Sequence, residues 1–140
     1  MTTVEQFLKA LAVVESSNNP EAWGDRELPK GPPPTTEQAA LDAIRSGLPR
    51  AMGRWQVHPD RLVFEAKSFN LWPTLGETYD HWVERILRAI FAEQTDRLLP
   101  VEVAMYWHLG HVTNEVNLDW DAKYAARFGA ALLNAQEDLP

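Results

Sequence analysis

Apolar residues recur at helical spacing along much of this chain, and this periodicity constrains its fold more than any other feature. In the first segment Val4, Phe7, Leu8, Leu11 and Val14 follow the i, i+3, i+4, i+7 pattern of one helix face. Later segments have similar apolar faces, and proline, glycine or capping residues separate them. We therefore expect a mainly α-helical domain.

The local signals predict the helix boundaries. Asn18 and Pro20 end the first helix, and the string 35–38 has the form of a capping box. A short extended or turn segment is expected around Gly53–His58, because glycine interrupts it. The expected helices span approximately residues 4–15, 35–46, 59–68, 78–98 and 100–110. Thr78 is the expected cap of the fourth helix, and Asp119 is the expected cap of a last helix that contains Tyr124, Phe128 and Leu132.

Length and composition limit the functional classes to which this protein can belong. The 140 residues predict a single domain, 1–140, and the absence of cysteine excludes disulfides, zinc thiolates and thiol nucleophiles. The net charge of −7 and the lack of a basic cluster argue against nucleic-acid binding. We expect no cofactor and no metal, and the sequence does not indicate an oligomeric state.

No segment of the sequence has the length and apolar character of a membrane span, so we expect no membrane insertion. The first residues lack the basic region of a secretory signal. The expected location of synthesis is the cytoplasm. A target in the cell wall would then require delivery by a phage or a secretion system.

Glu15 is the leading candidate for chemistry. It follows Leu11 by four residues, so it lies on the apolar stripe at the end of the first helix. Reduced access to water would raise the pKa of its carboxyl group, and a raised pKa suits a general acid near neutral pH. The alternative is an ordinary surface glutamate at a helix end.

Three short segments follow one another in a fixed order. Glu15–Ser16 ends the first helix, Gly53–Arg54–Trp55–Gln56–Val57–His58–Pro59 precedes another, and Tyr106–Trp107–His108–Leu109–Gly110 ends a later one. In this order the chain resembles the lysozyme-like superfamily, in particular soluble lytic transglycosylase (SLT)-like domains and phage cell-wall lysins. The resemblance covers roughly Phe7 to Leu133, with an insertion at approximately 31–50.

The resemblance implies cleavage of the β-1,4 bond between N-acetylmuramic acid and N-acetylglucosamine, with peptidoglycan or a related amino-sugar polymer as the partner. Glu15 would be the general acid and base. In that family a Gly-x-x-Gln segment and an Ala-Tyr-Asn-Ala-Gly segment accompany the Glu-Ser pair. Two departures are that Arg54 and Trp55 replace small or aliphatic residues and that His108 stands where the family has asparagine.

The resemblance also suggests substrate contacts for Ser16, Trp55, Gln56, His108 and Tyr124. Trp55 could stack on a sugar face or pack in the core. Gln56 could bind substrate, tie down its turn, or do both. Tyr124 could line the cleft, although its helical spacing with Phe128 fits a core position equally.

The resemblance implies that a lytic transglycosylase needs no second carboxylate, whereas in a lysozyme a second carboxyl group helps. Asp25 is the candidate in the Gly24–Asp25–Arg26–Glu27 string, and its distance from Glu15 would predict the stereochemical outcome. Glu27 is the second candidate for this role, after Asp25. Asp25 could instead be a solvated loop residue that pairs with Arg26.

Two alternatives to an enzyme remain open. A catalytically inactive lysozyme-like module could still bind glycan, and the acidic charge and the altered third segment favour this. The chain could also be a structural component of a phage or secretion apparatus, in which Glu15 is an ordinary surface carboxyl group.

Overall fold

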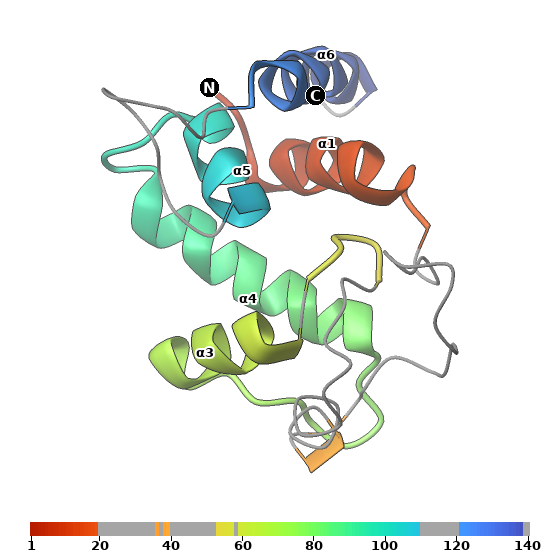
Figure 1. Cartoon of the computed structure of the whole chain (residues 1–140), viewed down its shortest axis with the longest axis vertical. Helices are drawn as coiled ribbons and strands as arrows, with labels where there is room; N and C mark the ends of the chain where they lie inside the picture. The colour runs from red at the N-terminus through yellow and green to blue at the C-terminus, as the bar shows by residue number, and fades with distance from the viewer. Residues whose placement is uncertain (20–35, 37, 40–52, 58, 110–120, 139–140) are drawn as a thin grey trace. The chain divides into compact units, whose positions relative to one another are not determined.

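The computed structural model describes residues 1–19, 36, 38–39, 53–57, 59–109 and 121–138. Within these ranges the protein is mainly α-helical, with five helices and no strand (Figure 1). The helices are α1 (Val4–Ser16), α3 (Pro59–Phe69), α4 (Tyr79–Gln94), α5 (Pro100–Leu109) and α6 (Ala122–Asp138). The predicted mainly α class is therefore confirmed. Most of the helix predicted at 35–46 lies outside the described residues.

The chain divides into two compact units. The first unit consists of Met1–Val14 and Arg88–Pro140, and the second consists of Glu15–Leu87. The first unit therefore contains most of α1, the end of α4, α5 and α6. The second contains the end of α1, the turn at 53–57, α3 and the beginning of α4.

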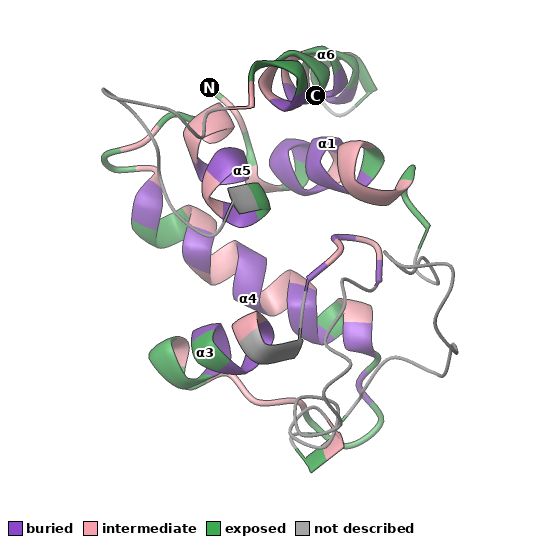
Figure 2. Cartoon of the chain, in the orientation of Figure 1, coloured by how far each residue is buried: buried purple, intermediate pink, exposed green. Residues whose placement is uncertain are grey.

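Aromatic side chains form the centre of the first unit. The ring centroid of Phe7 lies 4.9 Å from that of Phe91 and 5.8 Å from that of Phe128, so α1, α4 and α6 meet there. Along α6 the buried residues share one side of the helix (Figure 2), where small side chains complete the predicted aromatic stripe. The buried residues of α6 are Tyr124, Phe128, Ala131 and Ala135. Burial of such faces is the main source of stability here.

Helices α3 and α4 supply most of the buried side chains described in the second unit. Leu62, Trp82 and Ile86 are fully buried. Trp82 donates a hydrogen bond of 2.8 Å from its indole nitrogen to the carbonyl oxygen of Leu71, so the segment after α3 is held against α4. An indole N–H that is buried needs such a partner.

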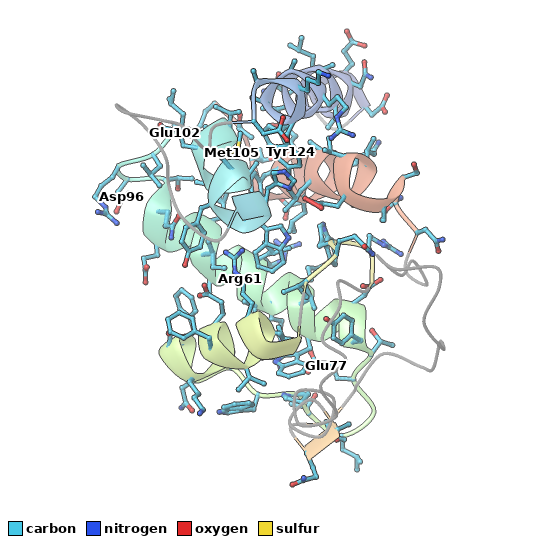
Figure 3. All side chains as sticks on the ribbon, in the orientation of Figure 1. Arg61, Glu77, Asp96, Glu102, Met105 and Tyr124 are labelled. Carbon is cyan, nitrogen blue, oxygen red and sulfur yellow. The ribbon has the colours of Figure 1, made fainter. Side chains whose placement is uncertain are left out.

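The buried carboxylate of Glu77 stabilises the segment that connects α3 and α4. Glu77 accepts hydrogen bonds of 2.7 Å at both oxygens from Arg85, and Oε1 also accepts one of 3.0 Å from the backbone nitrogen of Thr74. Arg85 donates a further bond of 2.7 Å to the carbonyl oxygen of Trp72. Figure 3 labels Glu77 in this region. These bonds, led by the one from Arg85, lower the pKa of Glu77 to about 2.

Two predicted helix boundaries were wrong. Helix α4 ends at Gln94 rather than near Leu98, and the Thr95 hydroxyl donates a hydrogen bond of 2.7 Å to the Phe91 carbonyl oxygen just beyond that end. The backbone nitrogen of Arg97 then bonds to the Gln94 carbonyl oxygen at 3.0 Å, three residues back instead of four, so the chain leaves the α-helix in a tighter turn. Helix α6 is capped by Asp121 rather than Asp119, because Oδ1 of Asp121 accepts a bond of 2.9 Å from the Tyr124 backbone nitrogen.

Candidate functional site

Glu15 is the penultimate residue of α1, and its side chain is half-buried. The helix stops at Ser16 because the next two residues, Ser17 and Asn18, have positive φ angles of 55° and 62°. Left-handed residues of this kind terminate helices. Asn18, which was predicted to end the helix, is one of these two residues, whereas Pro20 lies outside the described residues. Glu15 therefore lies in the last turn.

Ser16 connects the end of α1 to the turn that contains Gln56. Its hydroxyl group donates a hydrogen bond of 2.6 Å to the carbonyl oxygen of Arg54 and accepts one of 3.0 Å from the backbone nitrogen of Asn19. Both bonds lie within the second unit. The first two segments of the sequence pattern are thus held together by a side chain of the first one.

The Gly53–Gln56 turn is closed by two bonds to one acceptor. The carbonyl oxygen of Gly53 accepts hydrogen bonds from the backbone nitrogen of Gln56, at 3.2 Å, and from its side-chain amide nitrogen, at 2.9 Å. Gln56 has a φ of 51°, which is unfavourable for a residue with a side chain. The hydrogen bond from the Gln56 side-chain amide to the Gly53 carbonyl oxygen offsets this strain, so Gln56 does tie down its turn. Its contact with substrate stays a prediction.

The first two residues of α4 hold this turn from two directions. Oδ1 of Asp80 accepts a hydrogen bond of 2.9 Å from the backbone nitrogen of Arg54, and the Tyr79 hydroxyl donates one of 3.1 Å to the carbonyl oxygen of Val57. A Cβ atom at Gly53 would lie 2.8 Å from Oδ1 of Asp80 and 2.9 Å from the Tyr79 ring. Gly53, whose φ is 81°, is therefore required both by conformation and by space.

Arg54 and Trp55, which depart from the family pattern in the second segment, also face groups of this unit. Nε of Arg54 lies 3.6 Å from Oδ2 of Asp80, and its guanidinium group lies 5.8 Å from the centre of the Trp55 ring. Burial raises the pKa of Asp80, against the opposing effects of the bond from the Arg54 nitrogen and the Arg54 charge. Trp55 is only 4% exposed, as expected for the core position that the sequence left open.

The first unit contains the other two predicted contact residues. His108 is exposed on α5, and its ring stacks on that of Tyr124 at a centroid distance of 3.9 Å and an interplanar angle of 5°. Tyr124 is labelled on α6 in Figure 3 and is 1% exposed. Nε2 of His108 lies 3.3 Å from Oδ2 of Asp121, the residue that caps α6. Helices α5 and α6 are in contact, which brings these residues together.

The structure thus groups the predicted residues into two sets. Glu15, Ser16, Trp55 and Gln56 belong to the second unit, whereas His108 and Tyr124 belong to the first. Asp25 lies outside the described residues, as does most of the predicted insertion at 31–50.

Sequence reasoning missed Tyr79, Asp80 and Asp121. Tyr79 and Asp80 directly follow the predicted cap Thr78, and Asp121 lies two residues beyond the predicted cap Asp119. Their hydrogen-bonding groups were visible in the sequence, but nothing in it indicated which distant backbone or ring they would reach.

The described residues contain neither a metal-binding group nor a membrane-spanning helix. No group of three histidine, aspartate or glutamate side chains in this part of the chain could hold a metal ion. None of the helices described is long and apolar enough to span a membrane.

Comparison with known proteins does not identify a family for this chain. No protein-family model, curated protein or solved structure gives a significant match to this chain.

Proposed function

We propose that this protein has a lysozyme-like fold and cleaves the β-1,4 bond between N-acetylmuramic acid and N-acetylglucosamine in peptidoglycan. The observation that carries the proposal is the hydrogen bond from Ser16 to the Arg54 carbonyl oxygen. It supports the proposal because it joins the Glu-Ser pair to the Gly-x-x-Gln turn, and these are the two segments that the resemblance associates with the catalytic acid and a substrate contact.

In the proposed reaction, the carboxyl group of Glu15 donates its proton to the glycosidic oxygen as the bond to the anomeric carbon breaks. A hydroxyl group of the same muramic acid residue then attacks this carbon and transfers its proton to the Glu15 carboxylate. The products are a shortened glycan and an anhydro sugar end, and Glu15 is protonated again. General acid–base catalysis by one positioned carboxyl group is sufficient for this sequence of steps.

The turn would contribute by positioning Gln56. Its attachments to Ser16, Tyr79 and Asp80 would hold Gln56 in one place, and a preorganised contact contributes more to catalysis than a mobile one. His108, in the first unit, is proposed as an additional sugar contact. Tyr124 is 1% exposed, which favours the core position over a place in the cleft.

The test is mass spectrometry of purified peptidoglycan that has been incubated with the unaltered protein or with Glu15→Gln. Glu93→Gln, at an exposed position of α4, is the matched control. We expect anhydro-muropeptides from the unaltered protein and the control and none from Glu15→Gln. Reducing-end products would indicate hydrolysis instead, and Asp25→Asn would then be the next variant. Absence of products from the folded, unaltered protein would overturn the enzyme proposal.

The second candidate is a glycan-binding module without activity. The net charge of −7 and the presence of His108 in place of asparagine favour it. Sedimentation with insoluble peptidoglycan distinguishes it from a structural role, because both the unaltered protein and Glu15→Gln should then bind without producing fragments. Absence of binding would leave the structural component of a phage or secretion apparatus.

A further inference from the structure

The side chain of Arg54 is anchored at Nε and has hydrogen-bond donors left beyond it. Nε is buried and lies 3.6 Å from Oδ2 of Asp80, a distance that fits an ion pair but is too long for a hydrogen bond. The side chain as a whole is 36% exposed. Among the described residues, none accepts a hydrogen bond from the two terminal nitrogens of Arg54, and neither nitrogen is among the buried polar atoms without a partner. These terminal donors are therefore accessible.

The rest of Arg54 is held in place by its surroundings. Its backbone nitrogen donates a bond of 2.9 Å to Oδ1 of Asp80, and its carbonyl oxygen accepts one of 2.6 Å from the Ser16 hydroxyl. The guanidinium group lies 5.8 Å from the centre of the ring of Trp55, which is buried. A cation that is already positioned loses little conformational entropy when it binds an anion.

The position and charge of Arg54 indicate the kind of ligand that it can bind. Ser16, which bonds to Arg54, directly follows Glu15, so Arg54 belongs to the turn that is attached to the end of α1. The net charge of −7 gives the protein as a whole no attraction for an anionic glycan. A fixed guanidinium group supplies such an attraction locally, and its two terminal nitrogens fit the two oxygens of a carboxylate.

We propose that Arg54 is a specificity-determining residue whose terminal nitrogens bind a carboxylate on the muramic acid side of the glycan. The substrate class rests on the proposed function. The carboxylate belongs either to the lactyl group of the sugar or to the peptide stem attached to it, and the chemistry is the same in both cases. Chitin oligosaccharides have no carboxylate. The protein should therefore bind muramic acid glycans more tightly than chitin of the same length.

The preference is measured by isothermal titration calorimetry in the Glu15→Gln protein, so that no ligand is cleaved. The probes are a stem-free muramic acid tetrasaccharide, the same tetrasaccharide with peptide stems, and the chitin tetramer. We expect at least one carboxylate probe to bind about tenfold more tightly than the chitin tetramer. Tighter binding of the stem-free probe would identify the lactyl carboxylate, and tighter binding of the stem-bearing probe would identify the stem.

Three further substitutions in the same background test the role of Arg54. Arg54→Gln should abolish the preference, because the Kd of the carboxylate probe rises about tenfold and that of the chitin tetramer does not. Arg54→Lys keeps the charge without the planar pair of donors, so an intermediate preference is expected. Arg97→Gln removes the same charge from an exposed position and should keep the full preference. Added salt should weaken the preference wherever Arg54 is present.

The proposal would be overturned by equal binding of all three probes, by no binding of the carboxylate probes, or by an equal loss of affinity for all probes in Arg54→Gln. If Arg54→Gln does not fold, Arg54→Lys and the salt dependence decide, and an unchanged preference in both would overturn the proposal. None of these results requires cleavage. An Arg54-dependent preference without peptidoglycan fragments would contradict only the enzyme proposal, whereas fragments without this preference would contradict only the role of Arg54.

Discussion

The hydroxyl group of Ser16 lies 2.6 Å from the carbonyl oxygen of Arg54 and donates a hydrogen bond to it. The two residues are 38 positions apart in the chain, and the bond attaches the last turn of α1 to the turn that contains Gln56. Glu15, the proposed catalytic residue, directly precedes Ser16 at this end of the helix.

Replacement of Ser16 by alanine should lower the free energy of unfolding by about 1–2 kcal/mol, because one partly buried hydrogen bond, to Arg54, and one exposed hydrogen bond, from Asn19, are lost. Ser68→Ala is the matched control, since the Ser68 hydroxyl donates only to the Phe64 carbonyl oxygen of its own helix and is exposed. Urea unfolding of both variants measures the difference. Equal effects in the two variants would contradict a special role for Ser16 in stability.

Two glycines among the described residues have positive φ, and they allow conformational strain to be separated from steric clash. Gly53 and Gly76 have φ angles of 81° and 80°, but a Cβ atom meets close neighbours only at Gly53. Gly76→Ala should therefore destabilise the protein by roughly 1–2 kcal/mol, the strain of a left-handed alanine. Gly53→Ala should destabilise it by roughly 3 kcal/mol or more, because overpacking adds to the strain. Similar free energies of unfolding for the two variants would contradict the described packing at Gly53.

Tyr79→Phe removes one hydrogen bond from the same turn while the aromatic ring is retained. The hydroxyl group is buried and donates to the Val57 carbonyl oxygen at 3.1 Å. Burial also raises the pKa of this phenol well above 10, so it remains a donor through the neutral range. We expect a loss of about 1–2 kcal/mol in thermal or urea unfolding, because the carbonyl oxygen is left unsatisfied. If peptidoglycan is cleaved, the turnover rate should fall as well, since Gln56 becomes less well held.

The Glu77 carboxylate should make stability depend on pH in the acidic range. Its pKa is lowered from 4.5 to about 2 in the folded protein, first by the hydrogen bond from Arg85. A lowered pKa stabilises the folded state above the unfolded value, and this contribution is lost as the pH falls from about 4.5 to about 2. The full contribution is on the order of 3 kcal/mol.

Urea unfolding of Glu77→Gln across this pH range tests the assignment. The variant should be clearly less stable than the unaltered protein at neutral pH, and the difference should shrink toward pH 2. Glu93→Gln, exposed on the same helix, serves as the control. A stability difference that does not change with pH would show that Glu77 contributes through packing alone.

Much of the secondary structure could be predicted because its causes are local. The apolar stripe of α1, the Thr78 cap and Pro59 at the start of α3 act on residues within one or two helical turns, so they can be identified in the sequence. The predictions of α1 and α3 agree with the structure within one residue at each end, and the Thr78 hydroxyl accepts the expected bond, from the His81 nitrogen at 3.1 Å. The cap of α6 was predicted wrongly, because the local pattern indicated Asp119 and the structure uses Asp121.

The candidate site depends on tertiary structure because its defining contacts join distant residues. The sequence by itself identified Glu15, Ser16, Gln56 and His108 by residue type and order. Only the folded chain shows which distant residues they contact. Ser16 bonds to Arg54 across 38 residues, and Asp80 accepts a bond from the Arg54 nitrogen across 26. Asp121 contacts His108 across 13 residues. Periodicity and capping depend on neighbouring residues along the chain. Hydrogen-bond partners at such separations depend on how the helices pack.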